Sequence, residues 1–236
     1  MPFDGKNSLI ILPTYNERHN LEPMTQAIWD ILPAVHILVV DDQSPDGTGR
    51  LANALSKQDQ RLFVLHRWKN RGLGRAYIDG FTWALQRDYQ SVFEMDADFS
   101  HQPEHLPKFL NALLDADIVL GCRYMPGGGV KGWATHRQWL SKFGNFYAKR
   151  LLNVEYRDLT GGFKCFRRRA LQQLDLQAIA SNGYNFQVEV TYQAHQKGLR
   201  IKEVPIVFVE REQGVSKMNW GICWEALTGI WKLRQQ

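Results

Sequence analysis

The sequence contains few cysteines, and those it has lie far apart. Cys122, Cys165 and Cys223 form no Cys-x-x-Cys pair and no cluster with histidine, which argues against a zinc site. Isolated thiols in odd number favour a reducing compartment. No apolar run approaches the roughly 20 residues needed to span a bilayer, and the first residues contain no apolar signal core. We therefore expect a protein that is soluble or lies on a membrane surface.

Several catalytic and nucleotide-binding motifs are also absent. No Gly-x-Ser-x-Gly or His-Glu-x-x-His segment occurs, and Gly72-Leu73-Gly74 lacks the spacing of a Walker loop or a Rossmann fingerprint. Nucleotidyltransferases share a similar sheet, but no Gly-rich triphosphate loop lies near the N-terminus. These absences count against hydrolase, ATPase, dehydrogenase and nucleotidyltransferase functions. The histidines have no metal-ligand spacing, so we interpret them as structural.

The composition is that of a globular protein. Its 236 residues are 44% apolar and 22% charged, which excludes disordered, collagen-like and coiled-coil chains. Lys and Arg total 29 against 24 Asp and Glu, and this excess favours a phosphate-rich or anionic membrane partner. No linker, repeat or low-complexity tract divides the chain, so we expect one domain over residues 1–236.

Short apolar segments alternate with segments of helical spacing. This alternation predicts an α/β fold with β-α-β units and a mostly parallel central sheet flanked by helices. The predicted strands are 8–12, 36–40, 62–66, 91–95, 118–120, 162–166 and 204–209. The predicted helices are about 20–32, 49–57, 74–87, 103–114 and 185–197. Three glycines at 127–129 predict a flexible segment, either a lid over a site or a plain loop.

The C-terminal stretch, about residues 219–236, has an apolar face of helical spacing. Its members are Trp220, Cys223, Trp224, Leu227, Ile230 and Trp231. Two interpretations stay open. One is a last helix packed on the core, and the other is an interfacial helix that binds a membrane or a membrane subunit.

Carboxylates follow two of the predicted strands. Asp41 and Asp42 follow the second strand, and Asp96-Ala97-Asp98 follows the fourth. Since ligands of open α/β sheets bind at the carboxyl ends of the strands, we expect these side chains near a ligand. An Asp-x-Asp turn can hold Mg²⁺ or Mn²⁺, whose other ligands come from substrate phosphates. Asp42 could then hydrogen-bond a nucleobase or ribose. The alternative interpretation is that it forms an Asx-turn into the next helix.

Aromatic and basic residues supply the complement to these carboxylates. Tyr15 could stack on a base and Glu17 could accept a hydrogen bond from a base or ribose, although each could also be a turn residue. Arginine suits bidentate phosphate recognition and lysine acts as a point charge. The candidates at loops or element ends are Arg123, Arg137, Arg211 and Lys217. We interpret two further basic clusters, 67–75 and 167–169, as solvated or anionic-surface contacts.

Eight features occur together in one order along the chain. They are segments 13–18, 39–48, 72–77, 95–104 and 121–124, then Trp133 with Arg137, then segments 158–164 and 211–217. This set runs from about residue 8 to residue 218. It strongly resembles the polyprenol-phosphate (dolichol-phosphate) mannosyltransferases of glycosyltransferase family 2, and its specificity comes from the combination.

The resemblance implies a GT-A fold, a GDP-mannose donor, a polyprenyl (dolichyl) phosphate acceptor and Mg²⁺ or Mn²⁺. It implies a nucleotide-binding half at about 1–122, an acceptor-side half at about 123–218 and an amphipathic C-terminal helix. The residues implied to line the guanosine site are Pro13, Tyr15, Glu17, Val40 and Asp42. Those implied to meet the donor diphosphate are Asp96, Ala97 and Asp98, with both aspartates on the metal, together with Arg123, Arg211 and Lys217.

The implied reaction inverts the sugar. An acceptor phosphate oxygen, already anionic near neutral pH, attacks the anomeric carbon and gives a β-linked mannosyl phosphate. Asp98 and Arg137 are implied to be catalytic, because Asp98 positions the cation and Arg137 holds the acceptor phosphate in line. Some relatives have a Gln metal ligand two residues past the second aspartate. Ser100 stands there in this chain, which leaves the third protein ligand open.

Many relatives continue into transmembrane helices, and this sequence has none. We therefore expect a cytoplasmic enzyme held peripherally on the cytoplasmic face of a membrane, by the membrane surface or a separate anchoring subunit, with no nucleic-acid partner. Two alternatives remain at this stage. One is a related family 2 enzyme that uses a UDP-sugar such as UDP-glucose with the same lipid. The other is a non-catalytic nucleotide-sugar-binding subunit, against which the Asp96/Asp98 pair and Arg137 argue.

Overall fold

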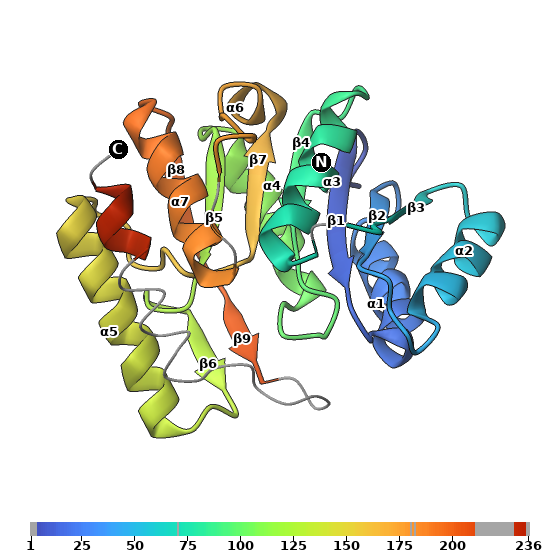
Figure 1. Cartoon of the computed structure of the whole chain (residues 1–236), viewed down its shortest axis with the longest axis horizontal. Coiled ribbons are helices and arrows are strands. Elements are labelled where there is room, and N and C mark those ends of the chain that lie inside the picture. Colours follow the sequence, from blue (N-terminus) through green and yellow to red (C-terminus); the bar gives the residue numbers. More distant parts are fainter. Residues whose placement is uncertain (1–3, 70, 180, 182, 211–228, 235–236) are drawn as a thin grey trace.

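A seven-stranded sheet runs through the computed structural model, in the order β3-β2-β1-β4-β7-β5-β8 (Figure 1). The structure describes residues 4–69, 71–179, 181, 183–210 and 229–234. β7 is antiparallel to its neighbours β4 and β5, and the other strand pairs are parallel. The strands are β1 (Ser8–Thr14), β2 (His36–Asp41), β3 (Leu62–His66), β4 (Ser91–Glu94), β5 (Ile118–Cys122), β7 (Lys164–Arg167) and β8 (Ile201–Pro205).

Helices cover both faces of this sheet, which explains why its strands are apolar almost throughout. Ile10 and Leu12 of β1 point into one core cluster, while Leu9 and Ile11 point into a second cluster on the opposite face. The first cluster contains α1 (Arg18–Ile31), α2 (Thr48–Gln58) and α4 (Leu106–Leu113), the last of which follows a 3₁₀ turn, η1 (Pro103–His105). The second contains α3 (Leu73–Leu85), α6 (Arg168–Leu171) and α7 (Gly183–Gln196).

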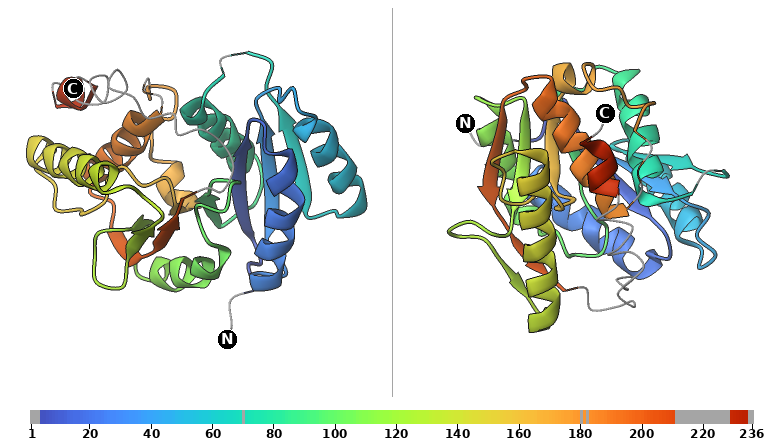
Figure 2. Two further views of the ribbon diagram at one scale, coloured as in Figure 1. Left: turned by 90° about the horizontal axis from the view of Figure 1, so that it is seen from below. Right: turned by 60° about the vertical axis from the view of Figure 1, so that its left-hand side comes forward.

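The second half of the chain adds a smaller layer to one end of the sheet. β6 (Gly129–Lys131) pairs in parallel with β9 (Val207–Val209). The long helix α5 (Thr135–Leu152) lies at the periphery beside the last helical residues, 229–233, far from α2 at the other end of the molecule (Figures 1 and 2). A third apolar cluster joins α5, α7 and this last helix.

Most predicted elements are confirmed, and two predictions need correction. The single strand predicted at 204–209 is two strands in different sheets, since β8 ends at Pro205 and β9 begins at Val207. Part of the glycine segment 127–129 is not loop, because β6 begins at Gly129. Among the described residues, no helix combines the length and apolarity that crossing a bilayer requires. Of the predicted C-terminal apolar face, Ile230 is buried and Trp231 is exposed; its first four members lie outside the described residues.

Candidate active site

The sheet brings the predicted site residues to one edge. β2, β1 and β4 are adjacent and parallel, so the segments that follow them leave the sheet on the same side. These segments carry Asp42, then Tyr15 and Glu17, and then Asp96 and Asp98. β5 has the same direction, because β7 is antiparallel to both β4 and β5, and Arg123 follows it. The edge is therefore a polar surface built by four strand ends.

Asp42 is held firmly at this edge. Its carboxylate accepts the Gly72 backbone N–H at 2.8 Å and pairs with the Arg67 guanidinium. Arg67 is itself buried and donates from Nε to Asp79 at 2.6 Å. The prediction that Arg67 is a solvated surface contact is therefore wrong. It orients the Asp42 carboxylate at the edge.

The loop after β1 is fixed by hydrogen bonds to the loop after β2. The Glu17 backbone N–H donates to Thr48 Oγ1 at 3.0 Å, and the Glu17 carboxylate accepts from Asn20 at 2.8 Å. Tyr15 is exposed on this loop, whereas the Val40 side chain is fully buried in the core. Of the predicted guanosine contacts, Val40 therefore presents only its main chain to the edge, and Pro13 is half-buried beside it.

Asp41 was expected near a ligand together with Asp42 but was given no contact of its own, and in the structure it organises the same loops. Its buried carboxylate accepts from Thr14 Oγ1 at 3.2 Å and from Ser44 Oγ at 2.6 Å. A side chain at Gly49 would place its Cβ only 2.7 Å from Asp41 Oδ2. The absence of a side chain there lets α2 begin against this carboxylate.

The Asp96-Ala97-Asp98 turn is fixed by the residues that follow it. Asp98 Oδ1 accepts from the Ser100 backbone N–H at 3.0 Å and from Ser100 Oγ at 2.6 Å. The Asp96 backbone N–H donates to His101 Nδ1 at 3.0 Å, and Tyr77 OH reaches Asp96 Oδ1 at 3.4 Å. Ser100 therefore serves as a support for Asp98 in this geometry.

His101 holds this turn against Phe163 and against β9 of the smaller sheet. Its buried ring stacks on Phe163, with ring centroids 4.9 Å apart, and meets Phe208 of β9 edge-on at 5.4 Å. Burial lowers the pKa of His101 to about 4, which keeps the imidazole neutral at physiological pH. Its Nδ1 accepts a backbone hydrogen bond, so the sequence-based interpretation of this histidine as structural agrees with its position.

The turn suits a hard divalent cation. Asp96 and Asp98 are both partly exposed and supply carboxylate oxygens, the ligands that Mg²⁺ and Mn²⁺ prefer. No group of three or more His, Cys, Asp or Glu side chains with metal-binding geometry occurs among the described residues. The donor set thus fits a cation that takes its remaining ligands from a bound diphosphate and water.

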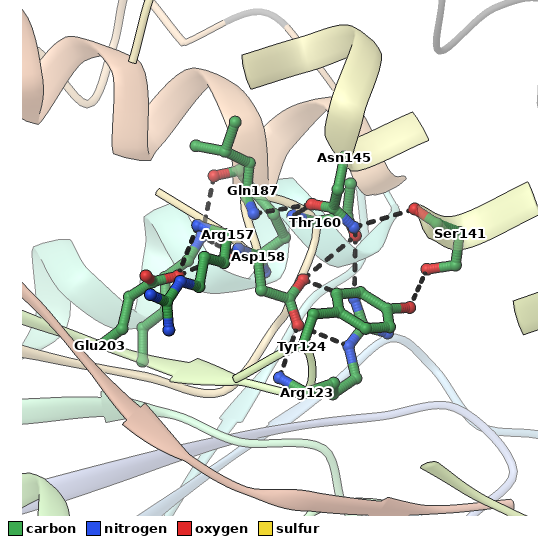
Figure 3. Close-up of polar contacts among 11 residues, drawn as sticks. Arg123, Tyr124, Ser141, Asn145, Arg157, Asp158, Thr160, Gln187 and Glu203 are labelled. Atoms are coloured by element: carbon green, nitrogen blue, oxygen red, sulfur yellow. Dashed lines mark hydrogen bonds and ion pairs between the residues drawn. The ribbon is translucent and has the colours of Figure 1, made fainter. Parts of the chain in front are cut away.

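Arg123 forms a buried ion pair rather than standing alone at the edge (Figure 3). Its Nε and Nη2 donate to the two oxygens of Asp158, each at 2.7 Å, and its backbone N–H donates to the same carboxylate at 3.0 Å. Nη2 also donates to Thr160 Oγ1 at 2.9 Å. Asn145 of α5 accepts from the backbone N–H groups of Leu159 and Thr160. This network ties α5 to the end of β5.

Arg137 lies in the first turn of α5. Its Nη1 donates to Glu210 at 2.6 Å, and its guanidinium stacks 4.1 Å above the Trp133 ring. Arg137 Nε is buried, and no hydrogen-bond partner for it lies in the part of the chain that the structure describes. Arg211 and Lys217, predicted to hold donor phosphates, fall outside the described residues.

Two buried charged residues lie directly below the site and were not predicted. Glu94 of β4 and Lys164 of β7 are paired in register and fully buried. Burial raises the pKa of Glu94 to about 7 and lowers the pKa of Lys164 to about 8, while the attraction between the two groups opposes both shifts. Lys164 also donates to the Gln187 carbonyl at 2.8 Å. No local pattern marks such a pair, because β4 and β7 are far apart in sequence.

Arg167 and Arg168 are partly buried and structural, which corrects the interpretation as solvated contacts, whereas Arg169 is exposed as predicted. Arg167 donates to the carbonyls of Leu113 and Ala116, where α4 ends. Arg169 pairs with the buried Asp117. These side chains satisfy polar groups at the ends of neighbouring elements, away from the carboxyl edge.

A mostly parallel sheet with an Asp-x-Asp turn at its carboxyl edge is typical of enzymes that use nucleotide sugars. The model of the family "Glycosyl transferase family 2" matches residues 9–175, and the chain belongs to this family. It is 47% identical over 233 residues to the polyprenol monophosphomannose synthase of Mycolicibacterium smegmatis, covering 97% of this chain and 88% of that protein. It is also 47% identical over 222 residues to the undecaprenyl-phosphate mannosyltransferase of Micrococcus luteus, covering 94% and 91%.

Solved structures agree with the fold. The glucosyl-3-phosphoglycerate synthase of Mycobacterium tuberculosis, in complex with Mn²⁺, uridine-diphosphate and phosphoglyceric acid, has a TM-score of 0.72 at 15% identity. The match covers 98% of this chain and 79% of that one. The predicted GT-A fold and glycosyltransferase class are thus confirmed.

Proposed function

We propose that this enzyme transfers mannose from GDP-mannose to a polyprenyl (dolichyl) phosphate and forms polyprenyl β-D-mannosyl phosphate. The observation that carries the proposal is the Asp96/Asp98 turn at the carboxyl edge of the sheet, in a chain 47% identical to two mannosyltransferases. The name of the Micrococcus luteus relative specifies undecaprenyl phosphate as its acceptor. The sugar and the lipid class of the acceptor follow from these relatives, and GDP is our inference for the nucleotide.

The donor nucleoside lies, in this proposal, between the loops after β1 and β2. Tyr15 is exposed where it can stack on the base, and Pro13 and the main chain of Val40 border the same space. Asp42 and Glu17 accept from the base or ribose. Because Arg67 and Gly72 already fix Asp42, little conformational entropy is lost when the ribose binds.

Asp96 and Asp98 hold Mg²⁺ or Mn²⁺ beside the donor diphosphate, with Ala97 between them. When bound, the cation stabilises the negative charge that develops on the departing diphosphate. Ser100 and His101 keep the two carboxylates in place before the donor arrives. This preorganisation reduces the reorganisation that the transfer step would otherwise require. Arg211 and Lys217 are proposed to supply further positive charge near the donor phosphates; the charge of Arg123, proposed for the same role, is balanced by Asp158.

Arg137 is proposed to bind the acceptor phosphate. Its Nε is a buried donor without a described partner, and its Nη1 pairs with the partly exposed Glu210. An incoming phosphate can therefore accept from Nε and replace Glu210 at Nη1. A phosphate monoester is already anionic near neutral pH, with a second pKa near 6. It therefore needs orientation more than a general base, and in-line attack on the anomeric carbon inverts the α-linked donor to a β-linked product.

We further propose that the enzyme works peripherally on the cytoplasmic face of a membrane, by contact with the lipid or with a membrane subunit, and binds no nucleic acid. Its lipid acceptor requires access to a bilayer. The described cysteines Cys122 and Cys165 are both free thiols, as a reducing compartment favours.

The test is transfer of labelled mannose from GDP-mannose to a short polyprenyl phosphate in detergent with Mn²⁺ or Mg²⁺, followed by NMR of the product's anomeric carbon. We expect a β-mannosyl phosphate and no turnover with UDP-glucose. Turnover with a UDP-sugar alone would overturn the donor assignment. Nucleotide binding without transfer from any donor would point to a binding subunit.

A further inference from the structure

Helix α5 exposes a stripe of aromatic side chains that its packing does not require. Trp139, Phe143 and Phe146 are 71%, 56% and 66% exposed. They are spaced four and three residues apart, which places them on one side of the helix. A row of three large exposed aromatics is costly in water and marks an interaction surface.

The opposite side of the same helix is already occupied. Asn145, Ala148 and Leu152 are buried, and Ala148 and Leu152 pack with Ile230 and Leu233 of the last helix. The fold therefore accounts for one side of α5, and the aromatic stripe is an additional feature of the sequence.

The charge of α5 indicates what covers the stripe. Its residues 135–152 include no Asp or Glu, while Lys142, Lys149 and Arg150 are exposed on it. An exposed aromatic stripe flanked only by cations is typical of a helix that lies in the headgroup layer of an anionic bilayer. Trp prefers that depth, and each nearby Lys or Arg contributes about 1 kcal/mol of attraction to anionic lipid.

The position of α5 fits the same surface. Arg137, the proposed acceptor-phosphate ligand, lies two residues before Trp139 on this helix, and the phosphate of a polyprenyl lipid lies at headgroup depth. α5 lies on the outside of the molecule, far from β3 at the opposite edge of the sheet (Figures 1 and 2). Residues two apart point to roughly opposite sides of a helix, so Arg137 faces away from the stripe, toward Trp133 and Glu210. Docking of the stripe would therefore bring the acceptor site close to the bilayer while Arg137 stays on the protein side of α5.

Resting on the proposed function, we infer that the Trp139–Phe143–Phe146 face of α5 is the surface on which this enzyme docks onto an anionic lipid bilayer. A membrane protein's apolar helix is the less favoured occupant, because it would leave the flanking cations without anionic partners. The C-terminal helix contributes Trp231, which is also exposed.

Vesicle co-sedimentation of the purified chain tests this inference. The probes are vesicles of phosphatidylcholine alone and vesicles that also contain phosphatidylglycerol. We expect binding to the anionic vesicles, and a loss of about tenfold or more in partitioning for the variant Trp139→Ser/Phe143→Ser/Phe146→Ser, since binding scales with buried apolar area. Lys142→Gln/Arg150→Gln should reduce the preference for anionic over neutral vesicles.

The control is Leu114→Ser. Leu114 is also largely exposed, at 61%, but it follows α4 beside the exposed Asp115, so its loss should leave vesicle binding unchanged. Wild-type partitioning by the triple α5 variant, or equal losses in the Leu114 control, would overturn the inference. Failure of the wild-type chain to bind any vesicle would also overturn it and favour a protein partner.

Transfer to a short, water-soluble prenyl phosphate separates this inference from the proposed function. The triple variant should retain that transfer at the wild-type rate, because none of its three residues lies in the site, while losing transfer to long-chain acceptor embedded in vesicles. Absence of soluble transfer in the wild-type enzyme would refute the proposed function without affecting the vesicle result.

Discussion

At the scale of single residues, the Asp-x-Asp turn is held by hydrogen bonds with the two residues Ser100 and His101. Ser100 fixes the carboxylate of Asp98, and His101 accepts the Asp96 backbone N–H. His101 Nδ1 has its lone pair engaged by the turn itself, and the Ser100 hydroxyl directs its proton to Asp98. Both act by positioning the ligands.

The variant pair His101→Phe and His101→Asn tests this role. Phe keeps the ring packing on Phe163 but leaves the Asp96 N–H unsatisfied, whereas Asn retains an acceptor close to the position of Nδ1. We expect the Mn²⁺ concentration for half-maximal transfer to rise about tenfold in the Phe variant, equivalent to about 1.4 kcal/mol, and less in the Asn variant. An unchanged Mn²⁺ requirement in the Phe variant would contradict the positioning role.

The ion pair between Arg123 and Asp158 makes a second residue-scale prediction. Asp158→Asn leaves the buried Arg123 charge without its partner, so the free energy of unfolding should fall by about 3–5 kcal/mol. Asp115→Asn removes the exposed pair with Lys202 and serves as the control, with an expected change below about 1 kcal/mol. Urea denaturation measures both; similar small losses would show that the buried pair contributes no special stability.

At the scale of elements, the regular strands and helices were predictable, including β7 and α7 in the second half of the chain, whereas the short strands β6 and β9 were not. The strand at 62–66 was predicted with its observed bounds, because an apolar strand between polar turns is a local signal. β6 and β9 are three residues each and exist through their mutual pairing and the bond from Val207 N–H to His105. No sequence window contains both partners, so their boundaries could not be predicted.

Asp117 joins three elements and gives a pH-dependent prediction. It accepts from Arg200 at 3.1 Å and pairs with Arg169 of α6, just before β5. The hydrogen bond from Arg200 lowers the pKa of Asp117 well below its usual value near 4, against the opposing effect of burial. The stabilisation is therefore present above about pH 4 and is lost as the pH falls through the lower folded pKa.

Asp117→Asn should lower the free energy of unfolding by about 2 kcal/mol at neutral pH. The difference from the wild-type protein should stay constant from pH 7 to about pH 5 and shrink below about pH 4. Denaturant titrations at several pH values measure this difference. A difference that grows on acidification would contradict the assigned ionisation.

At the scale of the whole molecule, the sheet brings residues from four strand ends to one edge. The smaller layer of β6, β9 and α5 is attached to it through polar contacts between residues distant in sequence. Asp42, Asp96 and Asp98 could be predicted because each follows a strand with a clear local pattern. Three buried contacts could not be predicted, because each joins residues that are distant in sequence. They are Arg67 with Asp42, Arg123 with Asp158, and Glu94 with Lys164. Residue types were thus predictable, and their partners were not.

The central claim is that the Asp96/Asp98 turn is the metal site of a mannosyltransferase. The most direct test compares wild-type enzyme and Asp98→Asn for transfer of labelled mannose from GDP-mannose to polyprenyl phosphate, with Mn²⁺ and with a chelator. We expect the wild-type reaction to require the metal and the variant to lose activity about 100-fold or more, with an unchanged melting temperature. Chelator-resistant transfer by the wild-type enzyme, or wild-type rates in the variant, would contradict the account.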